Sequence, residues 1–470
     1  MLFNSLQYLI FLPVAWMLFW LIPSRRIELL LVASYVFYAS WSLPYAAMVF
    51  GLVVVNYLFG LTLGRASQGR RALLAAFIAF DLGVLALFKY ADFGMTSVAN
   101  GTNALLGLQW DPPLLKLVLP LGISFFTFEF IHYLVDIYRG HVPVHSFSKF
   151  HIFAAFFPTQ IAGPIKRFQD FVPSLAHLDR FDAPLATQGL YLIGRGLAKK
   201  VLLADRLSPL VAHGFTAAAE GGIGTSDAWF ATLAFSLQIF FDFSGYTDIA
   251  RGSAALFGFR IPINFDAPYL ATSIADFWHR WHISLSTWLR DYIYIPLGGS
   301  RRQTPVVVRN LLITMLVGGL WHGAAWHFVA WGAFWGAGLA AHHLIRRRVS
   351  LPRTLPLLVV GWAFTQLYVV VAWVLFRADS FATAGVMLGA MAGHGASTGA
   401  LASRDGLFIG GIAAGLVVAT LISRRGWRPR LVLPAGLPRP VLVGAAAGLA
   451  ILAASMAVPT GREAFIYFQF

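Results

Sequence analysis

The stretch GGLWHGAAWHFVAWG, residues 318–332, combines an apolar composition with two imidazole side chains. Glycine, alanine, tryptophan and phenylalanine make up most of it, and such a composition suits the interior of a membrane. Ionisable side chains are costly there and are therefore functional candidates by default. The stretch consequently predicts a membrane-embedded fold, and it draws attention to His322 as a site of chemistry.

The rest of the chain places this stretch in a series of similar segments. Of the 470 residues, 58% are hydrophobic and 12% are charged, and the mean hydropathy is +0.70. Because a bilayer-spanning helix needs about 20 mostly apolar residues, we expect an all-α polytopic membrane bundle of about eleven or twelve spans. The expected spans lie near residues 1–22, 28–45, 47–64, 72–90, 116–138, 186–212, 228–258, 306–321, 324–345, 355–376, 407–422 and 439–458.

Two segments depart from simple spans. Residues 156–171 carry two prolines and a glycine within an apolar run too short to cross, which predicts a re-entrant or interfacial piece. Residues 274–299 read as one amphipathic helix rich in tryptophan and arginine, with His279 and His282 together on one flank. Since no linker is long enough to bound a soluble domain, residues 1–470 are expected to form a single membrane domain.

Basic side chains gather in the short segments between apolar runs. The formal net charge of +15 would suggest nucleic acid in a soluble protein, but this distribution is the topology signature of a membrane protein. We therefore exclude nucleic acid as a partner and assign the basic loops to the cytoplasm. Both termini then lie on the opposite side. The residues that set this orientation are Arg25, Arg26, Arg65, Arg70, Arg71, Arg139, Lys149, Arg301, Arg302, Arg346 to Arg348 and the arginines of 424–430.

The chain contains no cysteine. This excludes disulfides, thiolate metal sites and a covalent intermediate on cysteine. Residues 1–23 have neither a basic leader nor a small-residue cleavage site, so they are expected to form a retained first span.

Histidines supply the main catalytic candidates. Burial in a membrane keeps an imidazole neutral, which suits His322 to remove a proton from a hydroxyl, although hydrogen bonding across helices is an alternative role. His282 is a second catalytic candidate. His279 and His282 have a spacing that could hold a metal, but no acidic or histidine cluster lies nearby in the sequence, so no metal site is predicted. His327 is expected to be structural.

Charged residues within apolar runs have alternative interpretations. Asp242 and Asp248 could cap helix ends, pair with Arg251, or act directly in chemistry. Lys199 and Lys200 could extend towards the cytoplasmic surface, or attract the phosphates of a nucleotide-bearing acyl donor.

Six stretches follow one another along the chain: FFPTQIAGPIKRF (156–168), LAKKVLLADRL (197–207), DFSGYTDIARGSAALFGFRIPINFDAPYLATS (242–273), DFWHRWHISLSTWLRDYIYIPLGG (276–299), GGLWHGAAWHFVAWG (318–332) and FIYFQF (465–470). Together they resemble motifs of the membrane-bound O-acyltransferase family, and most closely its bacterial alginate O-acetyltransferase subgroup. The resemblance covers about residues 120–345 and resumes at the C-terminus.

The resemblance implies a membrane bundle with a tunnel or funnel near its centre. The family's characteristic histidine corresponds to His322, and a second position, often histidine or asparagine, corresponds to His282. Trp321, Trp281 and His279 would line the passage. His279 stands where the subgroup often has arginine, so its role stays open.

The resemblance also implies a reaction and a location. Family members take an acyl group from a cytoplasmic thioester such as acetyl-CoA, with no bound cofactor, and deliver it to a hydroxyl. In this subgroup the protein lies in the bacterial inner membrane and serves O-acetylation of an exopolysaccharide such as alginate. Periplasmic acetyltransferase proteins are its expected partners, and both termini would be periplasmic. Teichoic acid, a lipid or another surface glycan is the alternative acceptor, and a transporter of an acylated intermediate is the alternative function.

Overall fold

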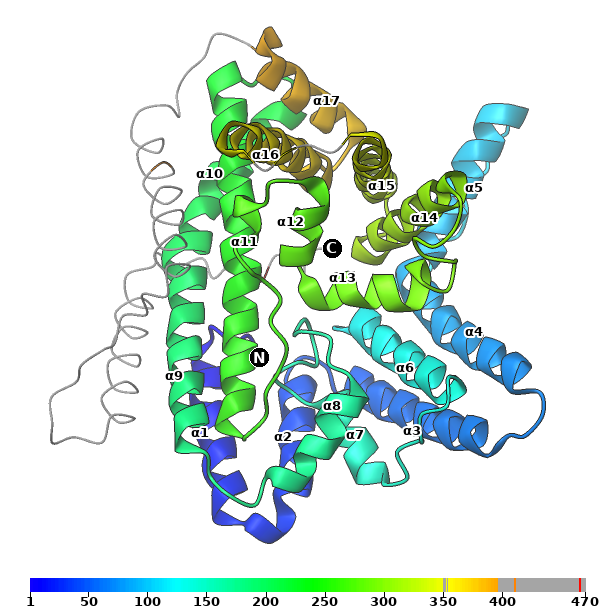
Figure 1. Cartoon of the computed structure of the whole chain (residues 1–470), viewed down its shortest axis with the longest axis vertical. Helices are drawn as coiled ribbons and strands as arrows, with labels where there is room; N and C mark the ends of the chain where they lie inside the picture. Colours follow the sequence, from blue (N-terminus) through cyan, green and yellow to red (C-terminus); the bar gives the residue numbers. More distant parts are fainter. Residues whose placement is uncertain (350–351, 353, 396–409, 411–464, 466–470) are drawn as a thin grey trace, which may run out of the picture. The chain divides into compact units, whose positions relative to one another are not determined.

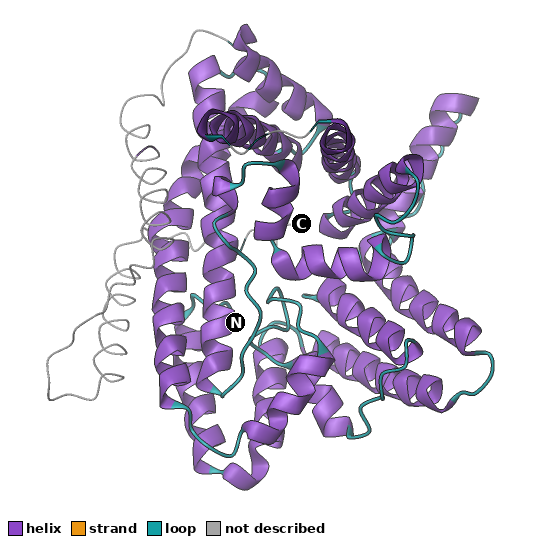
Figure 2. Ribbon diagram, in the orientation of Figure 1, coloured by secondary structure: helices purple, strands orange, loops and turns teal. Residues whose placement is uncertain are grey.

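The computed structural model describes residues 1–349, 352, 354–395, 410 and 465, and this part contains helices and no strand (Figure 1, Figure 2). The all-α prediction is confirmed. The predicted spans at 407–422 and 439–458 lie almost entirely outside the described residues, as does the C-terminal motif apart from Phe465. The described chain forms two compact units, which are treated separately below. That residues 1–470 act as a single domain stays a prediction.

The first unit comprises residues 1–193, 249–262 and 323–325. Within it, α6 packs against α3 and α4, and α7 packs against α2 and α3. Its helices are α1 (Leu6–Leu21), α2 (Arg26–Ala39), α3 (Leu43–Arg65), α4 (Arg70–Lys89), α5 (Ala91–Leu106), α6 (Ile123–Tyr138), α7 (Phe147–Ala155) and α8 (Phe168–Ser174), with short 3₁₀ turns at Pro23–Arg25 and Leu175–His177.

The second unit comprises residues 194–248, 263–322 and the described residues from 326 onwards. In it α14 packs against α15, and α15 packs against α16 (Figure 1). Its helices are α10 (Asp205–Ala219), α12 (Ile274–Arg280), α13 (Ile283–Leu289), α14 (Thr304–His322), α15 (Trp326–Arg348), α16 (Leu355–Arg377) and α17 (Phe381–Gly389). Three π-helical turns, η3 (Ala198–Ala204), η5 (Arg290–Tyr294) and η6 (Ala390–His394), and the 3₁₀ turn η4 (Pro268–Leu270) complete it. Helices α9 (Ala183–Leu197) and α11 (Thr225–Leu256) contribute residues to both units.

Serine caps mark several helix starts. The hydroxyl oxygens of Ser5, Ser273 and Ser380 accept hydrogen bonds from the backbone N–H groups three residues later, at 3.1 to 3.2 Å. Such caps satisfy donors that the first helical turn leaves without an intrahelical partner. They therefore set where α1, α12 and α17 begin.

Four helices of the described chain are long and apolar enough to cross a membrane: α3, α4, α14 and α16. A fifth span is possible if the pair Leu6–Leu21 and Pro23–Ala39, bent by 108°, counts as one. These helices confirm a multi-pass membrane protein, with fewer full-length spans than expected from the apolar runs. Among the described residues, the other apolar runs form helices that are shorter than 18 residues, such as the 16-residue α6, or less apolar than a span, such as α11 and α15.

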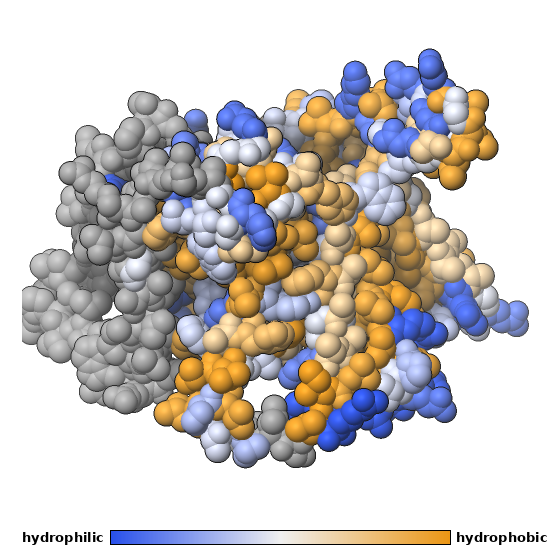
Figure 3. All heavy atoms as spheres, turned by 90° about the horizontal axis from the view of Figure 1, so that it is seen from above, coloured by the Kyte–Doolittle hydropathy of each residue, from blue (hydrophilic) through white to orange (hydrophobic). Residues whose placement is uncertain are grey.

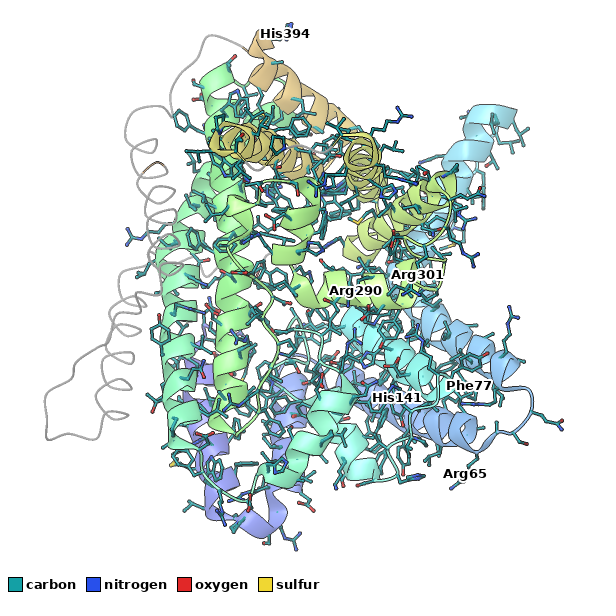
Figure 4. All side chains as sticks on the ribbon, viewed as in Figure 1. Arg65, Phe77, His141, Arg290, Arg301 and His394 are labelled. Atoms are coloured by element: carbon teal, nitrogen blue, oxygen red, sulfur yellow. The ribbon has the colours of Figure 1, made fainter. Side chains whose placement is uncertain are left out.

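Surface composition agrees with this assignment. Large apolar side chains are exposed along α16, including Val360 at 64% and Phe364 at 60% of their maximum. Figure 3 shows extensive hydrophobic surface on the face that it draws. Charged side chains stand at helix ends, as Arg65 does at the end of α3 and Arg301 in the turn before α14 (Figure 4). This distribution is what a lipid-facing helix bundle requires.

The irregular segment predicted at 156–171 is also present. Residues 156–166 form no helix, yet every one of them is buried in the first unit. Gly122 makes this possible, because a side chain there would lie 2.5 Å from the backbone oxygen of Gln160. Lys166, at the end of the segment, forms a buried ion pair with Glu129 of α6 at 2.7 Å. Irregular backbone is thus enclosed by protein, while a re-entrant or interfacial place in the membrane stays a prediction.

Candidate active site

His322 is the last residue of α14 and is buried, with 7% of its surface exposed. Its ring meets the rings of Trp331 and Phe376 edge to face, with centroids 5.0 and 5.1 Å apart. The ring of Trp321, the preceding residue, also meets the imidazole edge to face, with centroids 5.0 Å apart. Three aromatic rings from α14, α15 and α16 therefore enclose the imidazole.

Glycines bring α14 and α15 close enough to build this enclosure. A side-chain carbon at Gly319 would lie 2.3 Å from the backbone oxygen of Phe328, and one at Gly332 would lie 2.4 Å from that of Met315. Only glycine allows two helices this contact. Gly319 and Gly332 are thus required by helix packing.

His282 lies at a break in the chain. The segment 274–299 was expected to be one helix, and this prediction is wrong: α12 ends at Arg280 and α13 begins at Ile283. His282 adopts a left-handed backbone conformation, with φ 42° and ψ 56°, between the two helices. The break turns its side chain into the interior, where none of its surface is exposed.

His279 takes a different environment. It lies on α12 and is exposed, whereas His282 is buried, so the two do not share the flank that an unbroken helix would have given them. The apolar stripe predicted for the same segment does hold across the break, since Trp278, Trp281 and Trp288 are all buried.

The environment of His282 is aromatic. Phe243 of α11 meets its ring edge to face at 4.6 Å, and Trp321 lies 5.9 Å away. Burial lowers the pKa of His282 to about 3, because no water remains to solvate the charged ring. His282, from the break between α12 and α13, and His322, from α14, therefore both lie against the ring of Trp321.

The other predicted passage residue, Trp281, belongs to a stacked aromatic cluster. Its ring lies 5.6 Å from Phe277 at an interplanar angle of 13°, and 4.9 Å from Trp373. A cleft of about 470 Å³ exists in the first unit, but it is lined by α5 and by residues 108–114 and contains none of the predicted site residues. The tunnel therefore stays a prediction.

Comparison with known proteins identifies a matching family. The model of the membrane-bound O-acyltransferase family matches residues 129–382, which include both histidines and the rings around them. The chain belongs to this family. It is thus an O-acyltransferase embedded in a membrane.

Relatives of the chain come from several bacteria. The "Probable alginate O-acetylase AlgI" of Pseudomonas aeruginosa is 44% identical over 405 residues, covering 84% of this chain and 75% of the relative. That of Azotobacter vinelandii is 43% identical over 407 residues, covering 84% and 79%. The "Peptidoglycan O-acetyltransferase" of Helicobacter pylori is 33% identical over 430 residues, also covering 84% and 79%.

Lys199 and Lys200 of this O-acyltransferase lie in an ion-pair cluster of the second unit. Lys200 contacts Asp205 at 2.7 Å and Asp242 at 2.8 Å, while Lys199 contacts Asp248 at 2.7 Å. Arg195 adds a second contact to Asp248 at 2.6 Å. The prediction that these lysines extend to the surface is wrong for Lys200, whose side chain is only 9% exposed.

The π-helical turn η3 explains this arrangement. It shifts the helix register between α9 and α10, so that consecutive lysines both reach α11. The basic partners of Asp248 are consequently Arg195 and Lys199, whereas the sequence suggested Arg251. The aspartates neutralise the lysines, which leaves donor binding by Lys199 and Lys200 as an untested prediction.

Two features escaped the sequence interpretation. One is the Glu129–Lys166 pair, although a carboxylate within the apolar run FFTFEFIHYL is itself a signal of this kind. The other is Asn264, whose buried side chain contacts the start of α13. Nothing in its local sequence distinguishes this asparagine.

Among the described residues, no group of three or more histidines and carboxylates lies close enough to hold a metal.

Proposed function

We propose that this enzyme transfers an acetyl group from a cytoplasmic thioester, such as acetyl-CoA, towards the O-acetylation of an exopolysaccharide of the alginate type. The proposal rests on one structural observation: two histidines, forty residues apart, are buried against the same tryptophan ring. The acceptor is inferred from relatives 43 to 44% identical that are named as alginate O-acetylases.

His322 is the proposed general base. It takes the proton of an acceptor hydroxyl while the oxygen attacks the thioester carbonyl carbon. The C–S bond then breaks, an ester forms, and the proton passes from the imidazole to the departing thiolate. The product is one O-acyl ester and one free thiol, and no covalent intermediate on the enzyme is needed.

His282 is proposed to assist by donating an N–H to the carbonyl oxygen, on which negative charge develops. Its lowered pKa keeps the ring neutral, so one nitrogen is a donor and the other an acceptor. Trp321 and Trp281 are proposed to exclude water, which would otherwise hydrolyse the thioester.

Lys199 is the better of the two candidates for contacting donor phosphates, because its side chain is 21% exposed against 9% for Lys200. The exposed His279 is not assigned a step. The proposed location is the inner membrane with both termini in the periplasm, where exported acetyltransferase partners would receive the acyl group and complete its delivery to the polysaccharide.

Replacement of His322 tests the proposal, and His327 is the matched control. His327 belongs to the same stretch, but it is only partly buried and its Nδ1 lies 3.3 Å from the backbone oxygen of Leu375. The purified protein in nanodiscs is given acetyl-CoA and oligomannuronate, together with a periplasmic extract that supplies the acetyltransferase partners, and thiol release and ester formation are measured. We expect His322→Ala to lower both by about 100-fold or more, and His327→Ala to retain most activity.

Two results would contradict the proposal. If His322→Ala releases thiol at the wild-type rate, this histidine is not the base. If the wild-type protein moves an acylated compound across the membrane without releasing thiol, the transporter alternative holds.

Another surface glycan is the second candidate acceptor, and the Helicobacter pylori relative favours peptidoglycan among these. Mass spectrometry of exopolysaccharide and of cell-wall muropeptides from a deletion strain separates the two. Loss of acetyl esters from the muropeptides alone would replace the polysaccharide with peptidoglycan as the acceptor.

A further inference from the structure

The backbone of His282 is held by a segment that lies well before it in the sequence. The N–H of Ile283 donates to the backbone oxygen of Asn264 at 3.0 Å. The N–H of Ser284 donates to the side-chain oxygen Oδ1 of the same asparagine at 3.1 Å. On the other side of the break, the N–H of Asp266 donates to the backbone oxygen of Arg280 at 3.0 Å.

These bonds replace an ordinary helix cap. His282 is the N-cap residue of α13, yet its side chain makes no capping bond. The orphan N–H group of Ser284, which a capping serine or aspartate would normally satisfy, is satisfied by Asn264 instead. The imidazole therefore does not cap α13 and lies in the interior.

The conformation of His282 needs such support. A residue other than glycine at a positive φ is strained, and it persists only where surrounding contacts determine it. Asn264 supplies two of these contacts and is itself only 1% exposed. Without them, α12 and α13 would be free to join into one helix, which would return His282 to the flank beside His279.

We propose that Asn264 is a positioning residue that acts through His282, holding the left-handed break that turns this imidazole into the active site. The inference rests on the proposed function, because the proposed function gives His282 a part in the reaction. It adds a residue from the segment between α11 and α12, whose contribution is made entirely through the start of α13.

The hydrogen bonding of the Asn264 side chain suggests a conservative substitution. The side-chain nitrogen Nδ2 makes no hydrogen bond with any residue that the structure describes, whereas Oδ1 carries the cap. Asn264→Asp keeps an acceptor of the same size at a helix N-terminus, which favours negative charge. Asn264→Leu keeps the volume but removes the acceptor.

The experiment compares these variants with His282→Ala and with the double variant Asn264→Leu, His282→Ala. We expect Asn264→Leu to lower kcat by about 100-fold with little change in KM for the donor, since a small displacement of a catalytic group costs rate more than binding. Asn264→Asp should recover most of that loss. In the His282→Ala background, Asn264→Leu should cause no further loss of kcat, because Asn264 acts on the reaction only by positioning the imidazole that this background lacks.

Asn310→Leu is the matched control for folding. Asn310 is also a buried asparagine of the second unit, and its side chain donates to the backbone oxygens of Leu297 and Gly299. Rates are expressed per folded protein, measured by gel filtration in detergent. Asn310→Leu should lower the folded yield. Its rate per folded protein should not show the recovery by an aspartate variant that is expected at Asn264, and its effect should be the same with and without His282→Ala.

The outcomes separate the two proposals. If His282→Ala is inactive but Asn264→Leu is fully active, or if the two losses add, Asn264 is not a positioning residue and the proposed function stands. If Asn264→Leu and Asn264→Asp lower kcat equally, Asn264 does not act by accepting the hydrogen bond from the N–H of Ser284. If His282→Ala keeps wild-type activity, the role of His282 and the inference both fall.

Discussion

His282 and His322 come from separate segments of the chain and reach one tryptophan ring within the second unit. Both are buried in aromatic surroundings, and burial lowers the pKa of His282. A neutral ring can accept a proton or donate a hydrogen bond, and a charged one cannot accept. The aromatic enclosure is thus the physical basis for the chemistry proposed for these two side chains.

Burial of His282 has a consequence for stability against pH. Its pKa is about 3 in the folded protein and about 6.5 in the unfolded chain, so the unfolded state binds the proton first as pH falls. The stabilising contribution is complete above pH 6.5 and is lost as pH falls towards 3. From pH 7 to pH 5 this loss should be about 2 kcal/mol.

A comparison with His282→Asn isolates this effect, because asparagine does not titrate. We expect the difference in unfolding free energy between wild type and variant to shift by that amount between pH 7 and pH 5, measured by denaturation in detergent. A difference that stays constant over this range would show that His282 does not remain neutral in the folded protein.

Contact between α14 and α15 predicts a second outcome. Gly319→Ala would place a carbon 2.3 Å from the backbone oxygen of Phe328, which forces the two helices apart. We expect a loss of about 1 to 3 kcal/mol in stability and at least a tenfold loss of activity, since His322 lies one turn further on. Thermal melting and donor thiol release provide the measurements.

Gly385→Ala in α17 is the control for this substitution, because nothing lies within 4 Å of a side-chain carbon there. Alanine favours a helix over glycine, so stability should stay the same or rise by up to about 1 kcal/mol. Equal destabilisation by both substitutions would remove close helix packing as the explanation.

The ion-pair cluster of η3 and α11 makes a third prediction. Lys200→Met removes an ammonium group that contacts the carboxylates of Asp205 and Asp242, whose side chains are 9% and 3% exposed. Breaking a buried pair from one side costs about 3 to 5 kcal/mol, so the folded yield and melting temperature should fall sharply. Adding Asp242→Asn should recover part of the loss.

Arg180→Ala provides the comparison at the surface. Arg180 and Asp179 are 3.8 Å apart, with side chains 93% and 73% exposed, and such pairs contribute little. Its melting temperature should match wild type. If Lys200→Met also leaves the melting temperature unchanged, the ion-pair cluster is not a determinant of stability.

Orientation in the membrane belongs to the whole chain, and the absence of cysteine makes it testable. Two helices, α4 and α5, lie between Ser67 and Gln109, and of these only α4 is long and apolar enough to cross a membrane. Both residues are exposed. If basic loops are cytoplasmic, a membrane-impermeant maleimide added to spheroplasts should label Gln109→Cys and not Ser67→Cys. Permeabilised cells should show labelling of both, and the reverse pattern in intact spheroplasts would invert the assigned topology.

Much of the fold follows from local sequence. Apolar runs of sufficient length predict membrane helices, and the order of six motifs predicts the family to which the chain belongs. His322 could be singled out because an imidazole in an apolar segment is unusual. The inferences on membrane helices and on the family succeed because length, hydropathy and motif order are properties of neighbouring residues, while the role of His322 stays a prediction.

Tertiary contacts decided what periodicity could not. A pattern of apolar residues every three or four positions predicts one helix over 274–299, and it says nothing of the left-handed break at His282. That break depends on Asn264, eighteen positions earlier, and the partners of Lys200 depend on a π-helical turn and on α11. Contacts between residues distant in sequence satisfy the buried polar groups, and their energies exceed the local preference for continuing a helix. The sequence therefore determined the membrane helices and the candidate histidines, while folding decided which side chains face one another.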